Sequence, residues 1–385
     1  MSNKLSHTSI STFQECPKRW EYRYKEKIYG TTIGSSLVFG KAIDVALEWA
    51  LKNDMKDLAK YKELFLDNWN KFELNGQTYN TKDSALIIYS NRDLDIDLIP
   101  ADGIKELSEL IAPLIKEKIE VRTFISTLQK QKDIIGYDML PKERKIIYNT
   151  ACWWVCRTRG LLMLETFRST IVPQIKRVVS VQEKISITNG AGDEITGLID
   201  AVLEWNGIEE PVVFDFKTSA RPYEDDAVLT STQLSVYVNA VTEKYKTRKA
   251  GYIVFSKQLN KNKTKICSKC GYDGSGGTHR TCPEKDEVGV RCNGEWTIGI
   301  DPQCNVQVLI NDLPESIENL VMENMDVINS CINNGIFARN LTNCVNRYNT
   351  VCPYYEVCHK GSYDNVYRKP SDTTNDTTGK KPNSV

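Results

Sequence analysis

The fold is decided by the stretch Ile195-Thr-Gly-Leu-Ile-Asp-Ala-Val-Leu-Glu-Trp-Asn-Gly-Ile-Glu-Glu-Pro-Val-Val-Phe-Asp-Phe-Lys-Thr218. Its two halves are rich in β-branched and aromatic residues, and Asn206-Gly207 between them is a strong hairpin signal. We therefore predict two antiparallel strands joined by a two-residue turn at Gly207-Ile208. This register places Asp200 directly opposite Asp215.

The pair Asp200 and Asp215 would bring two negative charges together among apolar neighbours. Like charges opposite one another destabilise a sheet, and buried carboxylates need partners. A divalent cation would remove both costs, and carboxylate oxygens are ligands that Mg²⁺ and Mn²⁺ prefer. Lys217 lies on the same strand face as Asp215, where it can orient or activate a water and stabilise charge on a phosphate. The alternative is an exposed hairpin with an ordinary Asp–Lys ion pair.

Segments on either side of this hairpin indicate a mixed fold. Alternation predicts strands at 178–187 and 249–256, and helical periodicity predicts a helix at 230–245 between them. Helical texture also fills most of 54–167 and returns at 313–333. Strands confined to the middle of the chain predict an α/β or α+β fold, in which helices flank a central mixed sheet.

Composition divides the chain into six segments. They are N-terminal helices (1–53), a helical insertion (54–170), a core with the carboxylate pair (171–260), a cysteine-rich insert (261–296), C-terminal helices with further cysteines (297–367) and a polar tail expected to be disordered (368–385).

The overall charge excludes a histone-like polycation, because 50 Lys and Arg residues balance 50 Asp and Glu residues in a chain of 385. No stretch approaches 18 consecutive apolar residues, and Met1–His7 is polar, so we expect neither a membrane span nor a signal peptide. We expect the chain to remain in the cytoplasm, either bacterial or of a phage-infected host. Twelve cysteines in a reducing compartment point to metal binding.

One group of cysteines lies in the polar insert. Two of them form a Cys-x-x-Cys knuckle followed by glycine, and the other two come later in a segment with too little apolar content to fold alone. This pattern predicts a Cys₄ zinc site made by Cys267, Cys270, Cys282 and Cys292. A flexible loop with exposed thiols is the alternative, and His279 is a candidate replacement for one ligand.

A second group has three cysteines near the C-terminus, Cys344, Cys352 and Cys358. A tetrahedral site needs four ligands, and Cys16 supplies the fourth if the two ends of the chain meet. Cys331 is an alternative fourth ligand. Thiolate ligation alone does not distinguish zinc from an iron–sulfur cluster. The remaining cysteines, Cys152, Cys156 and Cys304, are expected to pack in the core.

Three motifs occur in order: Gly197-Leu-Ile-Asp200, Val213-Phe-Asp-Phe-Lys-Thr218 and Gln233-Leu-Ser-Val-Tyr237. Together they resemble the RecB-like branch of the PD-(D/E)XK nuclease superfamily. The resemblance implies a restriction-endonuclease-like core in which Asp200 and Asp215 bind Mg²⁺ or Mn²⁺, with Phe216, the residue after Asp215, also at the metal. It further implies that Lys217 assists catalysis and that Gln233 and Tyr237 contact DNA.

The chain departs from this family at one position. Members often carry a metal-binding His in a Gly-x-x-x-His pattern, and this chain has Gly40-Lys-Ala-Ile-Asp44 instead. Aspartate is a hard oxygen ligand and can bind Mg²⁺ or Mn²⁺ equally well. Asp44 is therefore a candidate metal ligand and catalytic residue. An ordinary surface aspartate on a helix is the alternative.

The second cysteine group also resembles the iron–sulfur subset of these nucleases, which includes CRISPR-adaptation exonucleases. The resemblance implies a [4Fe–4S] cluster on Cys16, Cys344, Cys352 and Cys358. Near Cys16, the basic residues Lys18 and Arg19 beside Trp20 and Tyr22 offer phosphate and base-stacking contacts. In the alternative arrangement the aromatic rings face inward and the basic residues are solvated.

These patterns predict a metal-dependent nuclease that hydrolyses DNA phosphodiesters, and family analogy favours exonuclease action on single-stranded ends. Its expected partners are DNA and recombination or replication proteins. A first alternative is a catalytically degenerate DNA-binding protein of the same fold. A second is an adaptor that binds DNA or protein through its zinc insert.

Overall fold

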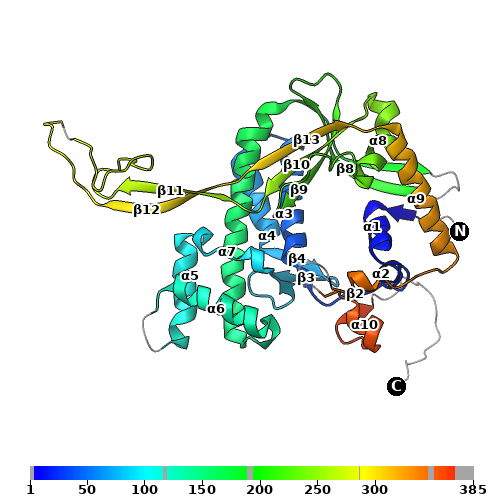
Figure 1. Ribbon diagram of the computed structural model, residues 1–385, viewed down its shortest axis with the longest axis horizontal. Helices are drawn as coiled ribbons and strands as arrows, with labels where there is room; N and C mark the ends of the chain where they lie inside the picture. The colour runs from blue at the N-terminus through cyan, green and yellow to red at the C-terminus, as the bar shows by residue number, and fades with distance from the viewer. Residues whose placement is uncertain (1–3, 116–118, 189–193, 286, 346–350, 369–385) are drawn as a thin grey trace.

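The computed structural model describes residues 4–115, 119–188, 194–285, 287–345 and 351–368. Its centre is a mixed sheet in the order β1-β8-β9-β10-β13, with β7 pairing along β8 (Figure 1). Strand β8 runs parallel to β1, and β9 runs parallel to β10, while the other neighbours are antiparallel. The sheet strands are β1 (Lys4–Ser6), β7 (Ile175–Thr188), β8 (Glu194–Trp205), β9 (Val212–Ser219), β10 (Lys249–Ser256) and β13 (Val306–Asp312).

Helices cover both faces of this sheet, as expected for the predicted fold class. One core cluster joins α3, α4 and α7 to the face that carries Phe214, and the other joins α1, α8 and α9 to the face that carries Val213 (Figure 1). The helices are α1 (His7–Glu15), α2 (Pro17–Trp20), α3 (Ser35–Lys52), α4 (Leu58–Trp69), α5 (Ala101–Ile111), α6 (Val121–Ile135), α7 (Lys142–Thr166), α8 (Thr232–Tyr245), α9 (Glu315–Asn333) and α10 (Tyr355–Lys360).

The central hairpin has the predicted register and a different turn. Ala201 pairs with Phe214, and Val202 pairs with Val213, in the predicted register. The predicted two-residue turn is wrong, because a longer loop at 206–211 joins the strands. Its first corner is Asn206-Gly207, where Ile208 N donates to Trp205 O at 3.1 Å and Gly207 has a φ of 80°. Glycine adopts this left-handed conformation without steric cost.

The segment predicted as a helical insertion shares its core with the sheet. Phe65, Trp69 and Tyr148 are fully buried in the same cluster as α3 and Phe214. Three short strands interrupt its helices. They are β4 (Lys71–Leu74), β5 (Gln77–Asn80) and β6 (Ile87–Ile88), of which β6 pairs with β3 (Ile33–Gly34).

The cysteine-rich insert forms an arm. Its stem is an antiparallel ribbon of β11 (Asn260–Cys267) and β12 (Trp296–Gln303), and Figure 1 shows it extending away from the body of the molecule. The insert ends later than the predicted boundary at residue 296, because β12 of its stem continues to Gln303.

The two ends of the described chain meet. Strand β2 (Ile28–Gly30) pairs antiparallel with β14 (Val366–Arg368), beside a small cluster that joins Tyr22 to Tyr354 and Val357. The predicted disordered tail lies, apart from Arg368, outside the described residues. Among the described helices, none has the length and apolar character needed to cross a membrane.

Candidate active site

The predicted catalytic residues converge where β8 and β9 separate. Within these two described strands, the ladder between them stops at Ala201–Phe214, so the predicted Asp200–Asp215 pair does not form. The Asp200 carboxylate fills the gap instead, where its Oδ2 accepts a hydrogen bond from Phe216 N at 2.8 Å. The separation has a physical reason, since direct opposition would press two negative charges together.

Asp215 lies at the centre of a polar network and is only 2% exposed. Lys217 Nζ is 2.6 Å from Asp215 Oδ2 in an ion pair, but this oxygen has no directed hydrogen bond. Gln233 Nε2 donates to Asp215 Oδ1 at 2.7 Å, and Lys217 Nζ donates to Gln233 Oε1 at 3.1 Å. Tyr237, one turn further along α8, has its OH 2.8 Å from Gln233 Nε2. The network therefore joins both strands to α8.

Electrostatic strain is concentrated in the three carboxyl groups. Burial, followed by the charge of Asp215, raises the pKa of Asp200 to about 8. Burial raises the pKa of Asp215 as well, although Lys217 opposes this effect. Burial acts against the charge on Lys217, but Asp215 and Asp200 outweigh it and hold the pKa of the ammonium above its usual value. Lys217 is thus protonated at neutral pH.

Asp44 on α3 completes this acidic group from the other side of the strands. The residue is exposed to solvent. Loss of solvation by the surrounding protein, and next the charge of Asp215, raise the pKa of its carboxyl to about 6. The charges of Asp215 and Lys217 act on this carboxyl, so Asp44 lies within electrostatic range of the hairpin residues.

Two residues at the site were missed by the sequence analysis. Gln182 on β7 has a left-handed backbone with φ of 54°, and its Nε2 lies 3.4 Å from Asp200 Oδ1. His7, at the start of α1, is 3.0 Å from Thr232 Oγ1, and burial together with the charge of Lys217 lowers its pKa to about 4. No sequence pattern marks either residue, because both reach the site through tertiary packing.

A family model agrees with this geometry. The model of the PD-(D/E)XK nuclease superfamily matches residues 4–88 and 128–359, which is most of the chain. The chain belongs to this superfamily. No curated protein matches the chain. The match includes α3, the central hairpin and α8, the elements that carry the acidic group, Lys217 and Gln233.

PD-(D/E)XK nucleases use divalent metals, and this superfamily member carries hard oxygen donors of the kind such an ion takes, although its three carboxylates do not all lie within 4.8 Å of one another. Asp44, Asp200 and Asp215 are hard oxygen donors, and each has a raised pKa, so their negative charges are incompletely compensated. Asp215 Oδ2 also lacks a hydrogen bond. The main chain of Phe216 faces Asp200 through its N–H, and the carbonyl of an extended residue points to the same edge as its N–H.

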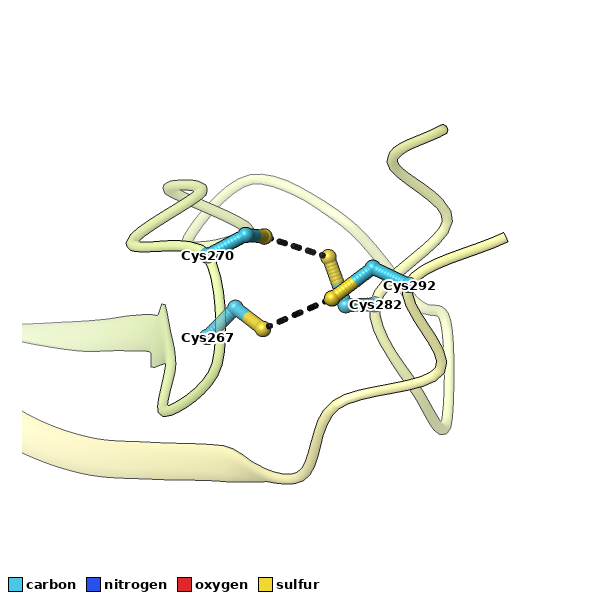
Figure 2. Close-up of side chains that lie close together, drawn as sticks. All are labelled: Cys267, Cys270, Cys282 and Cys292. Atoms are coloured by element: carbon cyan, nitrogen blue, oxygen red, sulfur yellow. Dashed lines mark hydrogen bonds between the residues drawn. The ribbon is translucent and has the colours of Figure 1, made fainter. Parts of the chain in front are cut away.

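The arm carries a second set of ligands at its tip. The sulfurs of Cys267, Cys270, Cys282 and Cys292 all lie within 4.8 Å of one another (Figure 2). Cys267 Sγ is 3.6 Å from Cys292 Sγ, and Cys270 Sγ is 3.5 Å from Cys282 Sγ. Four sulfurs around one tetrahedral ion with bonds of about 2.3 Å are about 3.8 Å apart. The group can therefore hold a single metal ion, and His279 is not part of it.

The other predicted cysteine group lines one cavity. Its members are Cys16, Cys344, Cys352 and Cys358, with His359 beside them. These sulfurs are more widely spaced than those of the arm, because the four do not all lie within 4.8 Å of one another. His359 Nε2 is 3.4 Å from Cys344 Sγ, a contact that the sequence analysis missed. Cys331 packs against the core of α1, α8 and α9 instead.

Near Cys16, the phosphate contacts of Lys18 and Arg19 stay a prediction, and the structure opposes the predicted base stacking. Lys18 and Arg19 line the same cavity, where they pair with Glu21 and Glu15. The predicted base stacking is wrong, because the aromatic rings face inward. Trp20 stacks on Phe337 with centroids 5.7 Å apart, and Tyr22 is buried against Tyr354. The expected core residues Cys152, Cys156 and Cys304 are buried.

Proposed function

We propose that this protein is a metal-dependent deoxyribonuclease that hydrolyses phosphodiester bonds of DNA. The observation that carries the proposal is the convergence of Asp44, Asp200 and Asp215 with a protonated Lys217 at the opening between β8 and β9. Asp44, Asp200, Asp215 and the carbonyl of Phe216 would hold Mg²⁺ or Mn²⁺. The bound ion would supply Lewis-acid stabilisation of charge on the scissile phosphate.

In this proposal Lys217 orients the attacking water and donates to a non-bridging oxygen of the phosphate. Its raised pKa suits a donor of hydrogen bonds and not a general base. Gln233 holds Lys217 and Asp215 in place through its two ends. In the turn from Gln233 to Tyr237, Gln233 is half-buried while Tyr237 is only 4% exposed, so Gln233 is the residue that would contact the strand. Asp44 extends the donor set in the position where relatives often have histidine.

We further infer that the chain is a RecB-like member of the iron–sulfur subset. The support is the shared cavity of Cys16, Cys344, Cys352 and Cys358, whose wide spacing suits a [4Fe–4S] cluster better than a single ion. The tight group in the arm suits Zn²⁺. Lys18 and Arg19 at the cluster cavity would contact DNA phosphates. Recombination or replication proteins are the expected partners.

Linear and circular single-stranded DNA, compared in the presence of Mn²⁺, test the proposed mode of action. We expect the linear strand to be degraded from its ends while the circle persists. Linearisation of the circle would identify an endonuclease instead. Binding of both substrates without cleavage of either would identify a catalytically degenerate DNA-binding protein, with Asp44 in place of histidine as the departure that motivates this alternative.

A further inference from the structure

A second polar cavity lies at the N-terminus of α3, away from the acidic group. It opens where Ser36 is exposed, and it lies next to the end of β9, because Lys257 N donates to Ser219 O at 2.7 Å. The cavity is lined by Ser35, Ser36, Phe39, Asp93, Cys156, Arg159 and Lys257.

Two cations at this cavity have no carboxylate partner in the part of the chain that the structure describes. Lys257 Nζ donates to Ser36 Oγ at 3.2 Å and lies 5.2 Å from the ring centroid of Phe39. Arg159 donates Nη1 to two main-chain carbonyls, Arg92 O at 2.9 Å and Asp93 O at 3.3 Å. Cations that form no ion pair are able to donate charge-assisted hydrogen bonds to a partner such as a phosphate.

Arg159 also has an unused donor. The residue is only 6% exposed, and its Nε is buried with no hydrogen-bond partner. Leaving a buried charged donor unpaired is costly, so such a group points to a missing acceptor. Arg159 lines the cavity together with Ser35 and Ser36, so its charge lies near the start of α3.

The start of α3 favours the same kind of ligand. The helix begins after Gly34, which provides no side-chain cap. The first N–H groups of a helix have no partner within it, and the helix dipole attracts negative charge there. An anion at the mouth of the cavity would meet these N–H groups, the Ser36 hydroxyl and Lys257.

The one carboxylate that lines the cavity is already occupied. Asp93 Oδ2 accepts hydrogen bonds from Ser35 Oγ at 2.7 Å and from Ser90 N at 2.6 Å. These donors are neutral, so the charge of Asp93 still acts on Lys257 and offsets one of the two cations. The cavity therefore has a net positive charge, because one carboxylate faces two cations and the N-terminus of a helix.

We propose that the mouth of this cavity, whose interior of about 10 Å³ has room for about one water, binds a phosphate group of the DNA strand at a position remote from the scissile bond. The inference rests on the proposed nuclease function. Asp44 lies on the same helix, about 13 Å from Ser35 at a rise of about 1.5 Å per residue. A stacked strand that advances about 3.4 Å per nucleotide along its axis, as in B-DNA, would span this distance in about four nucleotides. Between them Gly40 leaves open space, with no atom within 4 Å of where a Cβ would be, so a strand can lie close to the helix.

Binding of a fluorescent single strand in EDTA tests this site without cleavage. Lys257→Met keeps the apolar stem over Phe39 and removes the charge. We expect about tenfold weaker binding, as for loss of one charge-assisted hydrogen bond, and a slope of log K against log salt that is smaller by about 0.7. Ser36→Asp, which places a negative charge at the exposed mouth, should weaken binding without disturbing the core.

Lys249→Met is the matched control, since Lys249 begins the strand that Lys257 follows and lies at its opposite end. Strands with a 5′-phosphate and a 5′-hydroxyl distinguish the source of the phosphate. An equal loss for both supports an internal phosphodiester, and a loss confined to the 5′-phosphorylated strand supports a terminal phosphate. Unchanged affinity and slope in both Lys257→Met and Ser36→Asp, or an equal loss in Lys249→Met, would overturn the site alone. Failure of the wild type to bind any strand would overturn the nuclease proposal as well.

Discussion

The protein affects the charges of Asp200 and Lys217 in opposite directions within one network. Asp200 is a carboxylate whose charge the protein disfavours, and Lys217 is an ammonium whose charge the neighbouring carboxylates favour. A site of this kind is unfavourable for the empty protein and favourable for a bound cation. Perturbed groups that share a cleft are typical of functional sites.

Lys217→Ala should lower the cleavage rate by about 10²–10³-fold, the usual effect of removing one group that stabilises charge in the transition state. Affinity for DNA in EDTA should change little, because Lys217 faces Asp215 and Gln233. Single-turnover cleavage with Mn²⁺ measures the effect. Lys244→Ala, which removes an exposed lysine from α8, is the control. Undiminished turnover in Lys217→Ala would end its catalytic assignment.

Removal of metal should make stability depend on pH in a defined direction. The pKa values of Asp44 and Asp200 are raised to about 6 and about 8 in the folded protein, above the usual value of a carboxyl group. A raised carboxyl pKa means that folding stability is lost as pH increases through that value. In EDTA the melting temperature should therefore fall between about pH 4 and about pH 8 and level off above that.

Asp200→Asn should remove the part of this fall near pH 8, so that the variant melts several degrees above the wild type at high pH in EDTA. The same variant should not cleave DNA. Thermal melts across the pH range provide the measurement. Parallel profiles for variant and wild type would show that Asp200 is not the strained group.

At the scale of elements, sequence periodicity predicted the strands β7 to β10 and helix α8, because each combines a clear alternation or helical repeat with turn signals. It missed β1 and β13. Strand β1 is only Lys4–Ser6, and β13 lies between the arm and α9, where its pairing depends on β10. The left-handed backbone of Gln182 could not be predicted either, because it depends on the packing around Asp200 and not on the local sequence.

The arm is an element that should be separable from the core. None of the described residues between Leu259 and Cys304 belongs to a core cluster. Cys282→Ser should therefore abolish zinc binding, since Cys282 is fully buried among the four thiols, while thermal unfolding of the core stays unchanged. Metal analysis together with a melting curve tests this.

Cys304→Ser is the reciprocal control for the arm. This cysteine is buried in the core at the base of the ribbon, so the variant should melt at a lower temperature and keep its zinc. If Cys282→Ser unfolds the whole protein, the arm contributes to the core after all. The zinc-ribbon adaptor hypothesis predicts instead that this variant loses DNA or partner binding while core variants keep it.

At the scale of the whole molecule, the proposed iron–sulfur cluster would connect the two ends of the chain. Cys16 follows α1, and its Sγ accepts from Asn340 N at 3.5 Å, beside the pairing of β2 with β14. The split cysteine pattern required this meeting of the ends only if Cys16 is the fourth ligand. It gave no indication of His359, which approaches Cys344 only in the folded chain.

Cys16→Ser should reduce iron and sulfide content and lower the melting temperature by several degrees. A ligand at residue 16 closes a loop through almost the whole chain. Its loss raises the conformational entropy of the unfolded state, and the free energy of cluster binding no longer adds to the free energy of folding. Metal and sulfide analysis with visible absorbance measures this. Cys331→Ser is the control and should keep its iron. The reverse result would make Cys331 the fourth ligand, and zinc without iron in anaerobically purified wild type would exclude the cluster.

The central claim is that the acidic group of Asp44, Asp200 and Asp215 cleaves DNA with a divalent cation. Its most direct test is degradation of an end-labelled single strand by wild type, Asp215→Asn and Asp138→Asn, each with Mn²⁺ and with EDTA. Asp138 is an exposed aspartate in the helical insertion and serves as the matched control. We predict degradation by wild type and Asp138→Asn with Mn²⁺ alone, and none by a folded Asp215→Asn. Cleavage in EDTA, or cleavage by Asp215→Asn at the wild-type rate, would contradict the account.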